Sequence, residues 1–197
     1  CPPQLLLDLK YYNLSDYYNT AENNIHASGD VSAYYEKQLV HVPVSADYYN
    51  NKSALDTIHS AIIKLSPHIA SSGDKWNSRI GMGIAMESRE NSKSRFLFYP
   101  NIDFNYNIVD NIIVPYAGFA GGLKENTLQT LTGENAFLVP APGMKSTNEN
   151  WKMYGGLRGS ISKTVSYDTH TSYSKLEDMY FFVNDNSDLF KKGFNVI

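Results

Sequence analysis

The sequence lacks the cysteine pairs that stabilise a small disulfide-bonded protein and the long apolar run that forms a membrane-spanning helix. Its 197 residues contain one cysteine, Cys1, which excludes an internal disulfide framework. No run of about 18 apolar residues exists, so a transmembrane helix is excluded. The net charge is -3 and no basic cluster occurs, so no nucleic-acid partner is expected. Cys1 is either a lipidated mature N-terminus or a cut point within a longer protein.

Charged residues and helical periodicity are also scarce. Only 19% of the residues are charged, against about 25% in a typical soluble domain. Aromatic residues reach 13%, and 15 residues are tyrosine. The only helical candidate, residues 53–62, fits a strand equally well. Residues 1–197 are therefore expected to form one all-β region of about nine to ten strands.

The dominant pattern is alternation with period two. In FYPNIDFNYN, residues 98–107, every second residue is apolar and the intervening ones are almost all polar. Such alternation predicts a strand with one apolar and one polar face. The predicted strands are residues 4–13, 25–36, 40–49, 57–69, 76–89, 98–107, 112–123, 151–162 and 164–175, with a tenth strand beginning at Phe194. β-Bulges are expected at four prolines inside these strands: Pro43, Pro67, Pro100 and Pro115.

The connections between the predicted strands alternate between short and long. Short turns are expected at residues 37–39, 71–74, 110–111 and 162–163, and long connections at residues 15–23, 50–56, 90–93, 125–150 and 176–192. In an antiparallel up-and-down sheet this places the short turns at one rim and the long loops at the other. Outer-membrane β-barrels have this asymmetry, whereas a Greek-key sandwich gives no reason for it.

The apolar face is expected to contact lipid. The predicted strands match the roughly 9–11 residues that span a bilayer, and aromatic residues gather near their ends. The polar face carries charges, which a barrel lumen tolerates. The candidate lumen-facing residues are Asp30, Asp47, Lys64, Arg79, Asp103, Lys152, Arg158 and Asp168. The candidate lipid-facing residues are Ile80, Ile84, Ile102, Phe104 and Leu157. The predicted fold is therefore an antiparallel up-and-down transmembrane β-barrel.

Two alternatives belong to other functional classes. A soluble β-barrel that binds a ligand would bury the apolar face as its core. An outer-membrane barrel hydrolase could use Asp168, His170 and Ser172, which share one face of a predicted strand. Alternate residues of a strand lie about 6–7 Å apart, too far for the hydrogen bonds of a catalytic triad. The five histidines have no metal-ligand spacing. We therefore expect no catalytic, cofactor or metal site and no enzyme activity.

Two segments outside the strands have open assignments. Residues 124–150 are rich in proline, glycine and threonine; they either fold into the lumen or onto a partner, or form a mobile surface excursion. The aromatic run DMYFFVND, residues 178–185, could anchor at the membrane interface or pack on another chain.

Several segments carry a family resemblance. FLFYPNIDFNYNIVDNIIVPYAGFAGGLKENT, ENAFLVP, TNENWKMYGGLRGSISKTVSYDTHTSYS and MYFFVND resemble outer-membrane β-barrels of Bacteroidetes-type bacteria, often labelled TonB-dependent-receptor-like but plugless. The resemblance covers about residues 55–185 and implies no catalytic residue. It implies a bacterial outer-membrane location, lipid as a partner, and transport, porin-like or scaffold function alongside other outer-membrane or surface proteins. The last residues form no terminal strand ending in an aromatic residue, so we expect a portion of a larger barrel.

Overall fold

The computed structural model describes residues 3–16, 19–36, 38–53, 56–90, 92–109, 111–139, 144–184 and 194–197. The strands are β1 Gln4–Ser15, β2 Ala21–Tyr35, β3 Gln38–Lys52, β4 Thr57–Leu65, β5 His68–Ser72, β6 Trp76–Arg89, β7 Arg95–Tyr106, β8 Val114–Lys124, β9 Thr147–Ser160, β10 Ser166–Glu177, β11 Phe182–Asn184 and β12 Phe194–Val196. One helix, α1 Leu128–Glu134, interrupts the series between β8 and β9. The predicted all-β fold is confirmed.

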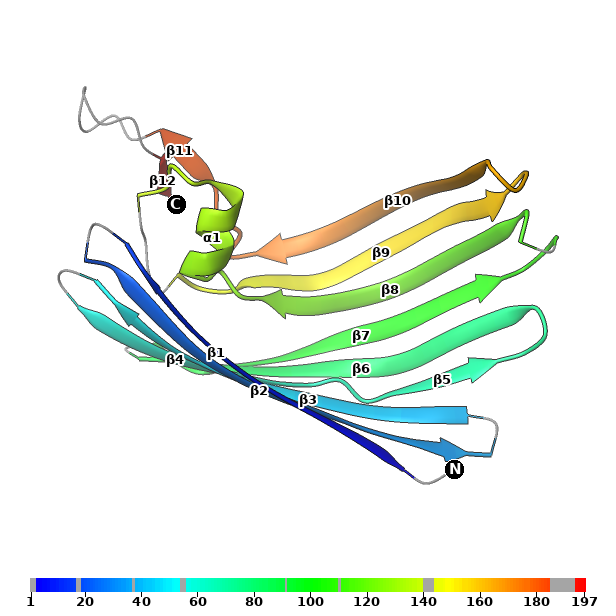
Figure 1. The fold of residues 1–197 in the computed structure, drawn as a ribbon, viewed down its shortest axis with the longest axis horizontal. Coiled ribbons are helices and arrows are strands. Elements are labelled where there is room, and N and C mark those ends of the chain that lie inside the picture. The colour runs from blue at the N-terminus through cyan, green and yellow to red at the C-terminus, as the bar shows by residue number, and fades with distance from the viewer. Residues whose placement is uncertain are drawn as a thin grey trace.

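Ten strands form one antiparallel sheet in the order β1-β2-β3-β4-β6-β7-β8-β9-β10 (Figure 1). β5 continues the line of β4, because both strands pair with β3 and with β6. With β4 and β5 counted as one position, each position from β1 to β10 pairs with the next along the chain, which confirms the predicted up-and-down topology. Within the described residues the sheet is open, since β1 and β10 are its two edges.

The sheet has two chemically distinct faces. We call the face over which residues 125–139 and 144–146 pack the inner face, and the opposite face the outer face. Residues directly opposite each other in a ladder point to the same side of a sheet. One line of opposite residues on the outer face, the outer apolar row, crosses the sheet from β2 to β10: Ala33, Val40, Ile69, Ile80, Ile102, Phe119, Met153 and Tyr173.

The predicted strand at residues 57–69 is broken at Ser66 and Pro67, which separate β4 from β5. The register is unchanged across the break: Val44 lies opposite Leu65 and His41 lies opposite His68. Ser66 donates its N–H to the Pro43 carbonyl at 3.0 Å, so the ladder resumes at once. The predicted proline bulges are therefore wrong. The register shifts occur elsewhere, between Ala120 and Gly122 in β8 and between Lys175 and Leu176 in β10.

A small core lies on the inner face. It consists of Tyr49, Ile62, Ala85, Tyr99 and Leu123, which come from five different strands. Residues 125–139 and 144–146 cover this end of the sheet, and Figure 1 shows α1 inside the curve of the strands at one rim. The opposite rim carries the β2–β3, β5–β6, β7–β8 and β9–β10 turns. The apolar side chains of the core are thus separate from those of the outer face.

Helix α1 was not predicted from the sequence. Its N-cap is Thr127, whose hydroxyl accepts the Thr130 N–H while the Thr130 side chain bonds back to the Thr127 N–H. This reciprocal capping box supports a helix of two turns that lacks strong periodicity. Among the described residues, no helix is long and apolar enough to cross a membrane.

The C-terminal strand differs from the prediction. β12 does not join the main sheet as a tenth strand but pairs with β11 in a separate two-stranded sheet. A parallel bridge joins Phe194 of β12 to Leu138, so this small sheet is tied to the segment that follows α1.

Gly81 allows β6 to approach the break between β4 and β5, and its replacement tests this packing. A Cβ atom at Gly81 would lie 2.8 Å from His68 Cα and would collide with the Pro67 carbonyl oxygen. We expect Gly81→Ala to lower the free energy of unfolding by about 1–3 kcal/mol through overpacking. Gly122→Ala is the matched control, because a Cβ there meets no atom within 4 Å. Equal stability of the two variants in urea titrations would contradict the close approach.

Candidate functional site

The inner face carries all eight candidate lumen-facing residues. The ladders place Asp47 opposite His26 and Ile62, and Arg79 opposite Asp103. Because Ile62 belongs to the inner core, this register assigns Asp47 to the inner face. The same reasoning, carried from ladder to ladder, places the other seven residues on the inner face. They lie on β2, β4, β6, β7, β9 and β10. Their exposure to a lumen remains a prediction, since the described sheet is open.

Three of these eight residues, Lys64, Arg79 and Asp103, take part in ion pairs. Arg79 donates from Nε to Asp103 Oδ2 at 2.7 Å across the β6–β7 ladder. Lys64 of β4 forms an ion pair with Glu125, which follows β8. The second pair joins the sheet wall to the segment that covers it. Charges of both signs are interspersed, so the inner face has no large region of one sign.

Two histidine–aspartate pairs lie on β2 and β3. His26 Nδ1 is 2.8 Å from Asp47 Oδ1, and His41 Nδ1 is 3.1 Å from Asp30 Oδ2. The His41 ring also stacks on His68 of β5, with centroids 4.9 Å apart. Within the described part of the chain, no group of three or more histidine, cysteine or acidic residues is arranged to hold a metal ion. These side chains instead link neighbouring strands.

The proposed catalytic set does not assemble into a triad. Tyr116 donates its hydroxyl to Asp168 at 2.9 Å, and the Arg158 guanidinium lies 5.5 Å from the centroid of the Tyr116 ring. Asp168 therefore contacts β8 and not its neighbours along β10. His170 and Ser172 are exposed, and no hydrogen bond joins them within the described residues.

The segment after β8 is fixed to the inner face by a buried carboxylate. Glu22 of β2 is 1% exposed, and its two oxygens accept the Leu128 N–H at 2.8 Å and the Gln129 N–H at 3.3 Å. Tyr12 of β1 donates its hydroxyl to the same carboxylate at 2.8 Å. A carboxylate at a helix N-terminus satisfies free N–H groups and interacts favourably with the helix dipole. The wall of β1 and β2 thus holds the first turn of α1.

A second buried carboxylate holds the other end of this segment. Glu87 of β6 is 5% exposed and accepts a hydrogen bond from the Ser146 hydroxyl at 2.7 Å and from Arg95 Nε at 2.8 Å. Arg95 also donates to Asp178 at 2.6 Å, beyond the end of β10. These contacts favour the first of the two assignments for residues 124–150: the described part of the segment packs against the inner face.

One further contact ties α1 to the C-terminal segment. Tyr180 donates its hydroxyl to Glu134 at 2.7 Å. Burial, with the adjacent Glu134 carboxylate, raises the pKa of Tyr180 to about 12. Tyr180 therefore remains a neutral hydrogen-bond donor at physiological pH.

Two clefts flank the packed segment and the turns. A cleft of about 530 Å³ lies between α1 and the first three strands, lined by residues that include Tyr12, His26, Asp47 and Gln129. A second cleft of about 510 Å³ lies toward the opposite rim and includes Tyr34, Arg79 and Asp103. Both linings combine aromatic rings with hydrogen-bonding groups, which suits small polar solutes more than apolar ones.

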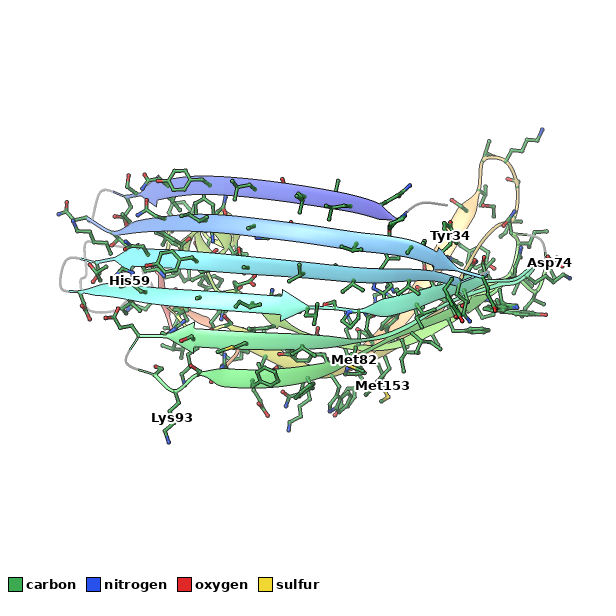
Figure 2. All side chains as sticks on the ribbon, turned by 90° about the horizontal axis from the view of Figure 1, so that it is seen from below. Tyr34, His59, Asp74, Met82, Lys93 and Met153 are labelled. Carbon is green, nitrogen blue, oxygen red and sulfur yellow. The ribbon has the colours of Figure 1, made fainter. Side chains whose placement is uncertain are left out.

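The candidate lipid-facing residues lie on the outer face. Four of them are exposed: Ile80 by 59%, Phe104 by 47%, Ile102 by 42% and Leu157 by 36%. Ile84 lies on the same face and is half-buried. Figure 2 shows Met82 and Met153, which belong to the same face, between the rim of His59 and Lys93 and the rim of Tyr34 and Asp74. Contact with lipid remains a prediction.

Sequence reasoning missed the two carboxylates that anchor the packed segment. Glu22 falls in residues 15–23, which were assigned to a loop, whereas β2 already begins at Ala21. The available signal was the alternation of Glu22 with Asn24 and His26, which extends the polar register of the strand. No protein-family model, curated protein or solved structure matches the chain.

Glu22 offers a direct test of how the segment is held. We expect Glu22→Gln to replace one acceptor oxygen by an NH₂ group and to leave a buried N–H of α1 unsatisfied, which costs about 1–3 kcal/mol. Hydrogen exchange of the α1 amides should then be about tenfold faster or more, by the conversion of about 1.4 kcal/mol per factor of ten. Glu36→Gln, at an exposed turn, removes the same charge and should leave the exchange unchanged. Equal rates in both variants would contradict the anchor.

Proposed function

We propose that this chain forms part of the wall of a bacterial outer-membrane β-barrel whose polar interior passes small hydrophilic solutes. The observation that carries the proposal is the outer apolar row, which is continuous from β2 to β10 and is covered by no part of the described chain. Contiguous apolar surfaces of this extent are rare on soluble monomers. A bilayer would cover the row without any further protein.

The aromatic residues of the outer face support a membrane-sized band. Tyr35, Trp76 and Tyr106 lie near the rim opposite α1, and Tyr11, Tyr48 and Phe96 near the rim of α1. Phe96 and Tyr106 are separated by ten positions of β7, about 33 Å at about 3.3 Å per residue. A strand tilt of about 45° reduces this to about 23 Å, close to the roughly 25 Å apolar band of outer-membrane barrels.

The inner face supports passage of polar solutes more than binding of an apolar ligand. Some of its charges form ion pairs, and its clefts are lined by hydroxyl, amide, imidazole and carboxylate groups. The segment anchored by Glu22 and Glu87 occupies one end of this face, where it would narrow a lumen. A soluble ligand-binding barrel would place its apolar residues inside, which is opposite to the exposure of Ile80 and Ile102.

The family resemblance and the open edges support the same proposal. The resemblance to plugless outer-membrane barrels of Bacteroidetes-type bacteria covers most of the strands. Within the described residues, the edges β1 and β10 have no further strand paired to them, and a bilayer does not tolerate unpaired backbone groups. The nine-position sheet is accordingly proposed to be a portion of a larger barrel with no enzyme activity.

Detergent dependence tests the membrane assignment. We expect the purified protein to stay monodisperse with β-type circular dichroism only in detergent, because the outer apolar row would otherwise associate in water. A control in buffer alone should aggregate at the same concentration. A stable monomer without detergent would contradict the proposal and would favour a soluble β-sheet protein.

A matched pair of arginine substitutions tests which face contacts lipid. Ile102 and Asn101 are adjacent in β7 and point to opposite faces. We expect Ile102→Arg to cost about 2–4 kcal/mol in bilayer unfolding titrations, as a charge at the lipid face near the midplane does. Asn101→Arg should cost much less, because a polar lumen solvates the guanidinium. Nearly neutral behaviour of Ile102→Arg would contradict lipid contact.

A further inference from the structure

The two edges of the sheet run in the same direction. Every ladder from β1 to β10 is antiparallel, and β4 with β5 fills a single position, so the sheet formed by the described residues has nine positions, an odd number. Strand direction alternates along the sheet, so an odd number of positions leaves the first and last strands parallel. Figure 1 shows the same relation, since β1 and β10 both end at the rim of α1.

This relation excludes simple closure of an antiparallel wall. Joining β10 directly to β1 would create a parallel pair, whereas bacterial single-chain barrels are antiparallel and have even strand numbers. In a closed antiparallel barrel, the strands between β10 and β1 must pair antiparallel with both of these parallel edges. Only an odd number of intervening strands can do this.

A second copy of the chain does not resolve the conflict. A two-fold axis along the barrel would place β10 of one copy beside β1 of the other, again as a parallel pair. A two-fold axis across the barrel would pair β10 with β10 in antiparallel fashion, but it would invert one copy. The α1 rims would then lie on opposite sides of the membrane, which a membrane protein inserted in one orientation does not allow.

We propose that an odd number of further strands of the same polypeptide lies between β10 and β1 and pairs antiparallel with both. This inference rests on the proposed function, because an open edge is costly only where water is absent. It specifies what the edges accept: strands that alternate apolar and polar residues, with the apolar register outward, and with a length that matches the 12 residues of β1 and of β10.

The side chains at the β1 edge specify this neighbour further. Leu5, Leu7 and Leu9 are highly exposed on the outer face, so the adjoining strand should continue the apolar band there. Leu6 is an apolar residue that points to the inner face, between the polar residues Gln4 and Asp8, and it is 70% exposed. The adjoining strand should therefore present an apolar side chain at the inner position beside Leu6, close to Asp8.

Cysteine cross-linking in the full-length protein tests direct closure. In a Cys1→Ser background, a cysteine at Leu5, Leu7 or Leu9 is combined with one at Tyr167, Thr169 or Thr171. Leu9→Cys with Ala27→Cys is the positive control, since these residues lie opposite each other in β1 and β2. With a strand between the edges, β1 and β10 are at least about 9.6 Å apart, beyond the roughly 7 Å limit for a disulfide. We expect the control alone to oxidise.

A photoreactive maleimide then identifies the neighbours and their direction. It is attached at Tyr167→Cys or Tyr173→Cys on β10, and at Leu5→Cys or Tyr11→Cys on β1, and the captured sites are mapped by mass spectrometry. We expect the sites captured along each edge to run in reverse sequence order, within one polypeptide of unchanged mass in denaturing gels.

Each other outcome overturns the inference. A β1–β10 disulfide shows direct closure, a cross-linked product of doubled mass shows a second copy, and any other gain in mass shows a separate subunit. Sites captured in parallel order refute the odd number, and failure to capture any site shows free edges. Detergent dependence is measured on the same samples, so edge pairing in a protein that is soluble without detergent would refute the membrane assignment alone.

Discussion

The register of the antiparallel ladders is the constraint on which the rest of the structure depends. Because side chains alternate with period two, a slip of one residue in any ladder would move its apolar set to the polar face. The outer apolar row exists only because each of the seven successive pairings that join its eight residues places an apolar residue opposite an apolar residue. The register of the ladders is the same on both sides of the interruption at Ser66 and Pro67. The Ser66 N–H still donates to the Pro43 carbonyl at 3.0 Å, and the Pro67 carbonyl accepts the Met82 N–H at 3.1 Å, so backbone hydrogen bonds continue across the break.

Separation of the faces also determines how the inner face is stabilised. With many large apolar side chains outside, the buried apolar residues described on the inner side are few: the small core around Tyr49 and Tyr99, and Leu128 and Leu131 of α1. Its other contacts are hydrogen bonds and ion pairs between neighbouring strands. Such pairs add little stability when exposed, but a buried carboxylate without a partner would be strongly destabilising. Glu22 and Glu87 are buried, and each is satisfied by several donors.

The sequence predicted the features that depend on period two and missed those that depend on contacts distant in the chain. The strands around residues 25–36, 76–89 and 98–107 were predicted because alternation is a local signal. Helix α1 was missed because its two turns are held by Glu22, about a hundred positions earlier in the chain. The predicted proline bulges were wrong because Ser66 and Pro67 break the strand without adding a residue to it.

The two buried carboxylates imply that the segment covering the inner face is a fixed element and not a swinging one. Glu22 holds α1 from β2, whereas Glu87 holds Ser146 from β6, so the segment bridges strands on different parts of the curve. Its position therefore depends on the curvature of the sheet between them. Any change in that curvature would have to break a buried carboxylate contact at one end. If the proposed barrel is correct, residues 125–139 and 144–146 would narrow its lumen to a fixed width at this end, and the polar groups that line the two clefts would select among the solutes that pass.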